Sequence, residues 1–138
     1  MKVKQISVFL ENTTGRLAEV TKTIADAGIN LRAISIADTA DFGILRMIVD
    51  KPDQGMQVLK DAEFTAKLTD VIGIVLNDKP GGLLTAMEIF NRDGVNIEYL
   101  YSSLINENDS VVIIFKVEDI EHGLEIVQKA GLEAIASF

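Results

Sequence analysis

Two loops of this chain carry the same residue types at the same spacing, in a pattern able to bind a small molecule. The first reads ENTTGRL over residues 11–17, and the second reads NDKPGGL over residues 77–83. Each precedes a segment with helical periodicity, so each exposes free N–H groups of a helix N-terminus beside glycine, where a ligand can approach the backbone. Such a loop can hold a carboxylate. Asn12 or Asp78 can cap the helix or accept a hydrogen bond from an ammonium group.

These loops belong to a longer internal repeat. Residues 6–37 align without a gap on residues 72–103, and the identical pairs are Ile6/Ile72, Leu10/Leu76, Gly15/Gly81, Leu17/Leu83, Gly28/Gly94 and Asn30/Asn96. After a two-residue insertion in the second copy the alignment continues through Val49/Val117, Gly55/Gly123, Ala62/Ala130 and Ala66/Ala134. In a duplicated chain we expect any binding site to occur twice, once in each copy, or to form where the two copies meet.

Periodicity predicts the elements that position the loops. Ile6, Val8 and Leu10 alternate as in a strand. Leu17, Val20, Ile24 and Ala27 recur as on one helix face, and Gly28 ends that helix. The first copy is expected to have strands at 6–10, 29–37, 43–50 and 64–68, and helices at 15–27 and from Pro52, with a turn at 38–41. The second copy is expected to have strands at 71–76, 95–104, 111–117 and 132–138, and helices ending at Gly94 and at about Ala130.

Each copy therefore has the order β-α-β-β-α-β. This order predicts an α+β fold of two ferredoxin-like units, each an antiparallel sheet with both helices on one face. The expected domains are residues 1–70 and 71–138, with no linker between FTAKL and VIGIVL. The opposite sheet faces carry branched apolar residues, which usually meet another surface. We therefore expect a homodimer, with Ile44, Ile48, Val112 and Ile114 covered by a partner chain or a crossing strand.

The motifs resemble those of ACT domains over essentially the whole chain. The second copy carries Asp78-Lys79-Pro80-Gly81-Gly82-Leu83, followed by Gly94-Val95-Asn96-Ile97. The first carries Asn12-Thr13-Thr14-Gly15-Arg16-Leu17, followed by Gly28-Ile29-Asn30-Leu31, with Asn12 and Thr14 where aspartate and proline are usual. The chain thus looks like a tandem pair of ACT domains without a catalytic domain.

This resemblance implies allosteric regulation through a small ligand, most often an amino acid, bound at an interface between ACT domains. One domain supplies its loop, here residues 12–17 or 78–83, and a facing domain supplies the start of strand two, here Ile29 to Leu31 or Val95 to Ile97. The more complete pattern favours the second loop, although the first, with its Asn12 and threonine hydroxyls, can bind instead or as well. Bulk at Gly15 or Gly81 is expected to block the ligand while leaving the fold intact, provided that φ there is negative.

Composition excludes several other classes. Net charge is −8, which opposes contact with nucleic acid or anionic lipid, and cysteine is absent, which removes thiolate chemistry. The acidic run around His122 is better explained by the positive end of a helix dipole than by a metal site. With a single histidine no catalytic set can be assembled, so we expect no enzyme, no metal and no cofactor. No secretory signal or membrane span is recognisable, and we expect a cytoplasmic protein.

Three alternatives to an amino-acid sensor remain at this stage. One is an assembly or dimerisation module that does not bind a ligand and docks on a partner enzyme or regulator. Another is a small ferredoxin-like enzyme, for which the sequence offers no acid pair. The third is RNA binding on the sheet face, which the net charge and the lack of paired stacking aromatics oppose.

Overall fold

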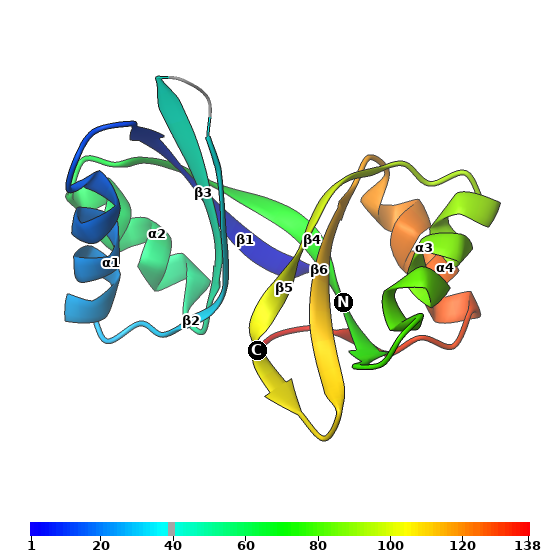
Figure 1. Cartoon of the computed structure of the whole chain (residues 1–138). Helices are drawn as coiled ribbons and strands as arrows, with labels where there is room; N and C mark the ends of the chain where they lie inside the picture. Colours follow the sequence, from blue (N-terminus) through cyan, green and yellow to red (C-terminus); the bar gives the residue numbers. More distant parts are fainter. Residues whose placement is uncertain (39–40) are drawn as a thin grey trace. The chain divides into compact units, whose positions relative to one another are not determined.

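The computed structural model describes residues 1–38 and 41–138, and these residues form two compact units. The N-terminal unit consists of Lys4–Thr69 together with Phe138, and the C-terminal unit of Asp70–Ser137 together with Met1–Val3. The predicted order β-α-β-β-α-β is found in both units, which confirms the α+β fold of two ferredoxin-like repeats (Figure 1).

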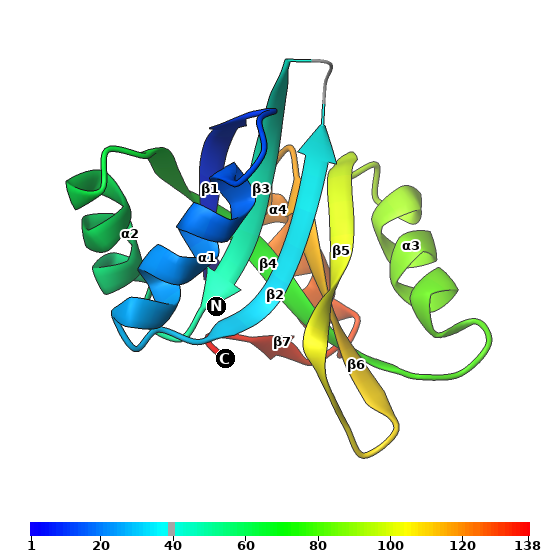
Figure 2. The same cartoon turned by 60° about the vertical axis from the view of Figure 1, so that its left-hand side comes forward.

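In the N-terminal unit, two helices pack on one face of an antiparallel sheet. The elements are β1 (Val3–Glu11), α1 (Arg16–Asp26), β2 (Leu31–Asp38), β3 (Phe42–Val49), α2 (Pro52–Asp61) and the first part of β4 (Thr65–Asn77). Strand β3 lies between β1 and β2, so that Leu45 is paired with Val8 on one side and with Ile36 on the other. The two helices lie side by side over these strands (Figure 2). Val20, Ile24 and Leu59 bury their side chains between the two layers.

The C-terminal unit repeats this arrangement. It contains the rest of β4, then α3 (Gly82–Arg92), β5 (Ile97–Glu107), β6 (Ser110–Val117), α4 (Ile120–Lys129) and β7 (Ala134–Ile135). Strand β6 lies between β4 and β5, and β7 pairs with Gly73 and Ile74 of β4. The core is built around Phe90 and Phe115, whose ring centroids are 5.3 Å apart. Lys2 forms an ion pair with Glu121 of α4, which raises the pKa of the lysine above its usual value.

Local signals place most element ends within two or three residues of the prediction. Gly28 and Gly94 have φ of 72° and 70° and follow the helices that they were expected to end. Asn108 and Asp109, with φ of 52° and 59°, form the two-residue turn between β5 and β6, as type I′ hairpins require. β4 runs without a break from Thr65 to Asn77, so the predicted absence of a linker is confirmed. The predicted turn at 38–41 falls partly on residues 39–40, outside the described residues.

Two expectations need correction. The strand expected at 132–138 has only two residues, Ala134–Ile135. Leu17, expected on the core face of the first helix, is 43% exposed, because the buried face of α1 is formed by Val20 and Ile24. Among the alternate sheet residues, the expected burial is confirmed for Ile48 and Ile114, which are buried within a single chain, whereas Ile44 and Val112 are half-buried.

The face of β1 that points away from the helices also contains buried polar side chains. Gln5 and Ser7 are almost completely buried, and the Gln5 Nε2 donates a hydrogen bond of 3.1 Å to the Ser7 hydroxyl. Their mutual hydrogen bond offsets part of the cost of removing them from water. In the described part of the chain, the helices are too short or too polar to span a bilayer.

Candidate functional site

The first loop connects β1 to α1 through a left-handed glycine. Gly15 occupies the N-cap position with φ of 89°, and the loop is closed by a hydrogen bond of 2.8 Å from the Thr13 N–H to the Glu11 carbonyl. Within the described residues, no backbone carbonyl pairs with the N–H groups of Leu17 and Ala18 in the first turn of α1. These groups can therefore donate to an anion.

The second loop has the same backbone but a tighter fit. Gly81 is the N-cap with φ of 85°, and the backbone N–H of Lys79 donates to the Asn77 carbonyl at 3.0 Å. A Cβ atom added at Gly82 would lie 2.1 Å from the Asn77 carbonyl oxygen, so the start of α3 lies directly against the end of β4. In the first loop the equivalent residue is Arg16, whose side chain occupies space that the second loop does not provide.

The Asx residues of the loops do not occupy the N-cap positions that a capping role requires. Both instead connect the loop to the neighbouring hairpin through their backbones. The Asn12 N–H donates to the Asp41 carbonyl at 3.0 Å, and the Asp78 N–H donates to the Asp109 carbonyl at 2.8 Å. The φ angles of Gly15 and Gly81 are positive, so the condition under which a bulky residue there was expected to leave the fold intact is not met, and a side chain at either position strains the backbone.

A hollow of about 160 Å³ opens beside the first loop. It lies between that loop, the end of β1, β2 and the start of β3, and its accessible lining is more apolar than polar. Four predicted site residues line it, namely Asn12, Thr13, Arg16 and Leu17. The other lining residues are Leu10, Glu11, Ile36 and Gly43, which sequence reasoning did not select. The hollow therefore combines a polar loop with an apolar wall.

Arg16 is the main cation of this hollow. Its Nη1 pairs with the Glu19 carboxylate at 2.6 Å, and its guanidinium carbon lies 4.7 Å from the centre of the Phe64 ring. Its buried Nε has no hydrogen-bond partner in the described structure. A guanidinium has five N–H donors, so Arg16 can bind a further carboxylate while it keeps the Glu19 pair.

The residues expected to form the opposite wall lie elsewhere within each unit. In the N-terminal unit the loop adjoins the pair Glu11–Phe42, whereas Leu31 pairs with Val49 at the other end of the sheet. Ile29 and Val95 are buried in the two cores, and Leu31 and Ile97 pack against these cores. Asn30 and Asn96 are exposed, and their backbone carbonyls accept hydrogen bonds from the backbone N–H groups of Asp50 and Glu118. Neither unit brings these residues to its own loop.

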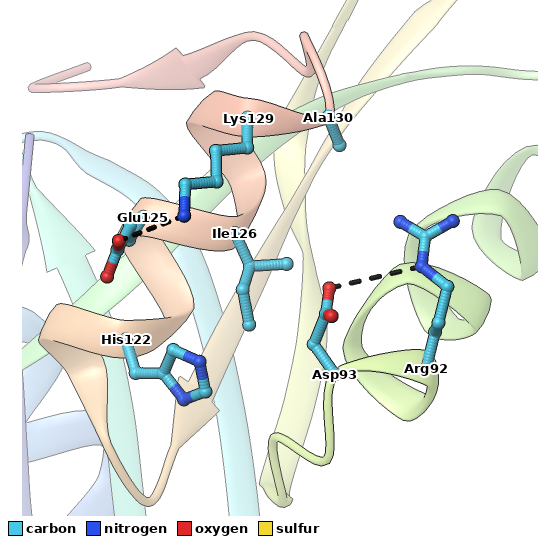
Figure 3. A pocket seen from close by; sticks show the side chains of 7 residues that line it. All are labelled: Arg92, Asp93, His122, Glu125, Ile126, Lys129 and Ala130. Carbon is cyan, nitrogen blue, oxygen red and sulfur yellow. Dashed lines mark ion pairs between the residues drawn. The ribbon is translucent and has the colours of Figure 1, made fainter.

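A second hollow, of about 290 Å³, lies between the end of α3 and one side of α4 (Figure 3). Its charged groups are already paired: Arg92 with Asp93 at 4.0 Å, and Lys129 with Glu125 at 3.1 Å. His122 also lines it, and the backbone N–H of His122 donates to Asp119, the N-cap of α4. Among the residues that the structure describes, no group of three or more acidic or histidine side chains could hold a metal.

Comparison with known proteins identifies the class of this chain. Residues 1–137 match the family of ACT domain pairs, and the chain belongs to that family. Protein BT0572 from Bacteroides thetaiotaomicron is similar in structure, with a TM-score of 0.92, 39% identity, and coverage of 98% of this chain and 92% of that protein. A search of curated proteins found no match.

More distant structures share the fold. The regulatory subunit of aspartate kinase from Thermus thermophilus, in its ligand-free form, has a TM-score of 0.65 and 21% identity, with coverage of 92% of this chain and 91% of that subunit. The corresponding subunit from Thermus flavus has a TM-score of 0.62 and 17% identity, with the same coverage. At these identities the likeness concerns the fold alone.

Proposed function

We propose that this protein is a regulatory ACT domain pair that binds a free amino acid at a strand–helix loop. The observation that carries the proposal is the hollow beside the first loop, which brings Asn12, Thr13, Arg16 and Leu17 together. Its loop offers Arg16 and helix N–H groups for a carboxylate, and Glu11 for an ammonium group. A zwitterion with a side chain on the same carbon matches this set of groups.

The proposal includes several features that follow from the ACT resemblance. The domains are residues 1–70 and 71–138, the protein forms a homodimer in the cytoplasm, and it acts on a partner enzyme or regulator rather than as an enzyme. A facing ACT domain supplies the wall opposite the loop, through residues near Asn30 or Asn96. The likeness to aspartate kinase regulatory subunits supports a regulatory role of this general kind.

A second candidate is an assembly module that binds no ligand. The second loop favours it, because the contact between Gly82 and the Asn77 carbonyl shows that a loop of this family can be closed by its own packing. The two candidates differ in one measurable property, which is the response of the protein to free amino acids.

A thermal-shift screen of the twenty amino acids tests the proposal. A ligand that binds the folded state alone stabilises it by about 2.7 kcal/mol at a hundred times its Kd, a shift that is easily measured. We expect at least one amino acid to raise the Tm, and calorimetric titration to give one binding isotherm for the same compound. If none of the twenty changes the Tm at millimolar concentration, the assembly module is the correct reading.

A further inference from the structure

The two repeats differ at the position that forms the floor of the hollow. In the first repeat Gly43 of β3 is paired with Leu10 of β1, and in the second repeat Val111 of β6 is paired with Leu76 of β4. These pairs are equivalent in the sequence repeat. Gly43 leaves the space beside Leu10 open and lines the hollow, whereas Val111 packs its side chain against the second core.

Two further exchanges distinguish the repeats in the same place. Arg16, the cation of the hollow, is replaced by Gly82 in the second repeat. Ile36 is replaced by Ser102. The two positions are equivalent in the sheets, because Ile36 is paired with Leu45 and Ser102 with Ile113. The second repeat thus has glycine and serine where the first has Arg16 and Ile36, and Val111 in place of Gly43, although it keeps an exposed leucine, Leu83, and has Lys79 at the position of Thr13.

Large apolar side chains are exposed at the rim of the hollow. Leu17 is 43% exposed and Ile36 is 52% exposed, although the other large apolar residues of α1 and β2 pack in or against the core. A ligand with an apolar side chain would cover both, and removal of this surface from water favours binding. An apolar cavity of about 150 Å³ holds a benzene molecule, so a hollow of about 160 Å³ accommodates a side chain of four to six carbon atoms.

We infer that the first repeat alone binds the ligand, that the ligand is an amino acid with an apolar side chain, and that Gly43 makes room for that side chain. This inference rests on the proposed function and narrows it. Arg16 binds the carboxylate, and Leu10, Leu17 and Ile36 surround the side chain of the ligand. A charged side chain is rejected, because it would lose its hydration against this wall without gaining a partner.

The substitution Gly43→Val tests the inference, because it gives the first repeat the residue that the second one already has. A Cβ atom at Gly43 would lie 3.6 Å from Ile36 Cδ1, an ordinary contact, and φ at Gly43 is outside the left-handed region. Valine is also favoured in strands, so the variant is expected to fold. The matched control is Val111→Ala, which changes the equivalent position of the second repeat.

The probes are leucine, isoleucine, valine, methionine and phenylalanine, compared with lysine, aspartate and glutamate in calorimetric titrations. We expect an apolar amino acid to bind the wild type, Gly43→Val to weaken it at least about tenfold, and Val111→Ala to bind as the wild type does. Circular dichroism and the ligand-free Tm confirm that each variant is folded.

Different failures point to different errors. If Gly43→Val is folded and binds the same amino acid as tightly as the wild type, the inference is wrong while the proposed function stands. If the protein binds lysine or an acidic amino acid in preference to the apolar ones, the assignment of the ligand class is wrong. If Val111→Ala loses binding and Gly43→Val keeps it, the site lies in the second repeat. If none of the twenty amino acids binds, the proposed function itself fails.

Discussion

Arg16 illustrates how one side chain can serve both the fold and the site. It is held by the Glu19 carboxylate on one side and by the Phe64 ring on the other, so its guanidinium has a defined orientation beside the hollow. A planar group held in this way loses little conformational entropy when it binds a carboxylate. Its buried Nε has no acceptor among the described residues.

We predict that Arg16→Lys weakens amino-acid binding by about tenfold or more, because a lysine ammonium cannot reproduce the stacked, planar donor. Calorimetric titration measures the Kd. The control is Arg92→Lys, which changes an exposed arginine of the second hollow and should leave the Kd unchanged. Equal Kd values for the wild type and Arg16→Lys would show that Arg16 does not bind the ligand.

The two glycines of the second loop have different structural roles, and substitution separates them. Gly82→Ala would place Cβ at 2.1 Å from the Asn77 carbonyl oxygen and is expected to lower the free energy of unfolding by at least about 3 kcal/mol. Gly81→Ala meets no neighbour within 4 Å and incurs only the cost of a positive φ, about 1–2 kcal/mol. Urea unfolding measures both, and similar losses for the two variants would contradict this assignment.

At the scale of the elements, the equivalent helices α2 and α4 begin in different ways. The Asp119 carboxylate accepts a hydrogen bond of 3.1 Å from the His122 N–H at the start of α4. The N-cap of α2 is Lys51, whose side chain makes no capping hydrogen bond, and the helix begins instead with Pro52. The acidic run around His122 therefore has a structural function as a helix start.

Removal of these two side chains should have unequal effects. Asp119→Ala is expected to lower the free energy of unfolding by about 0.5–2 kcal/mol, because an N–H group of α4 loses its acceptor. Lys51→Ala, at the equivalent position of α2, should change it by less than about 0.5 kcal/mol. Chemical denaturation provides both values. A larger loss for Lys51→Ala than for Asp119→Ala would refute the capping role.

At the scale of the whole molecule, the predicted homodimer depends on apolar surface that the single chain leaves exposed. Phe9 and Phe42 are 41% and 58% exposed, and Phe9 is paired with the half-buried Ile44 on the face of the sheet that points away from α1 and α2. Ile48 and Ile114 are buried without a partner chain. The patch formed by Phe9, Phe42 and Ile44 is therefore a better candidate for an intermolecular contact than Ile48 and Ile114 are.

We predict a dimer in sedimentation velocity at micromolar concentration. Phe42→Lys, which places a charge in this patch, should shift the protein toward the monomer. The control is Lys67→Met, which replaces a charged side chain by an apolar one on β4, another strand of the same unit. This change lies outside the patch and should leave the dimer intact. A wild-type monomer at these concentrations would refute the prediction, and an unchanged dimer in Phe42→Lys would place the contact elsewhere.

The sequence by itself determined the duplication, the order of elements in each repeat and the family. These features depend on local rules: alternating residues specify strands, and Gly28 and Gly94 end helices because each takes a positive φ. The repeat also located the loop at residues 12–17, four of whose residues line the hollow. The repeat alignment already contained the exchange of Gly43 for Val111, although nothing local indicated that it mattered.

Only the tertiary structure shows the hollow beside the first loop. The hollow depends on Leu10, Ile36 and Gly43, which come from three strands and meet only through strand pairing. The more complete motif of the second loop suggested a site there, but Gly82 serves to bring α3 close to Asn77. Whether a side chain lines a hollow, fills a core or closes a loop is set by neighbours distant in the chain, and a single sequence does not show those neighbours.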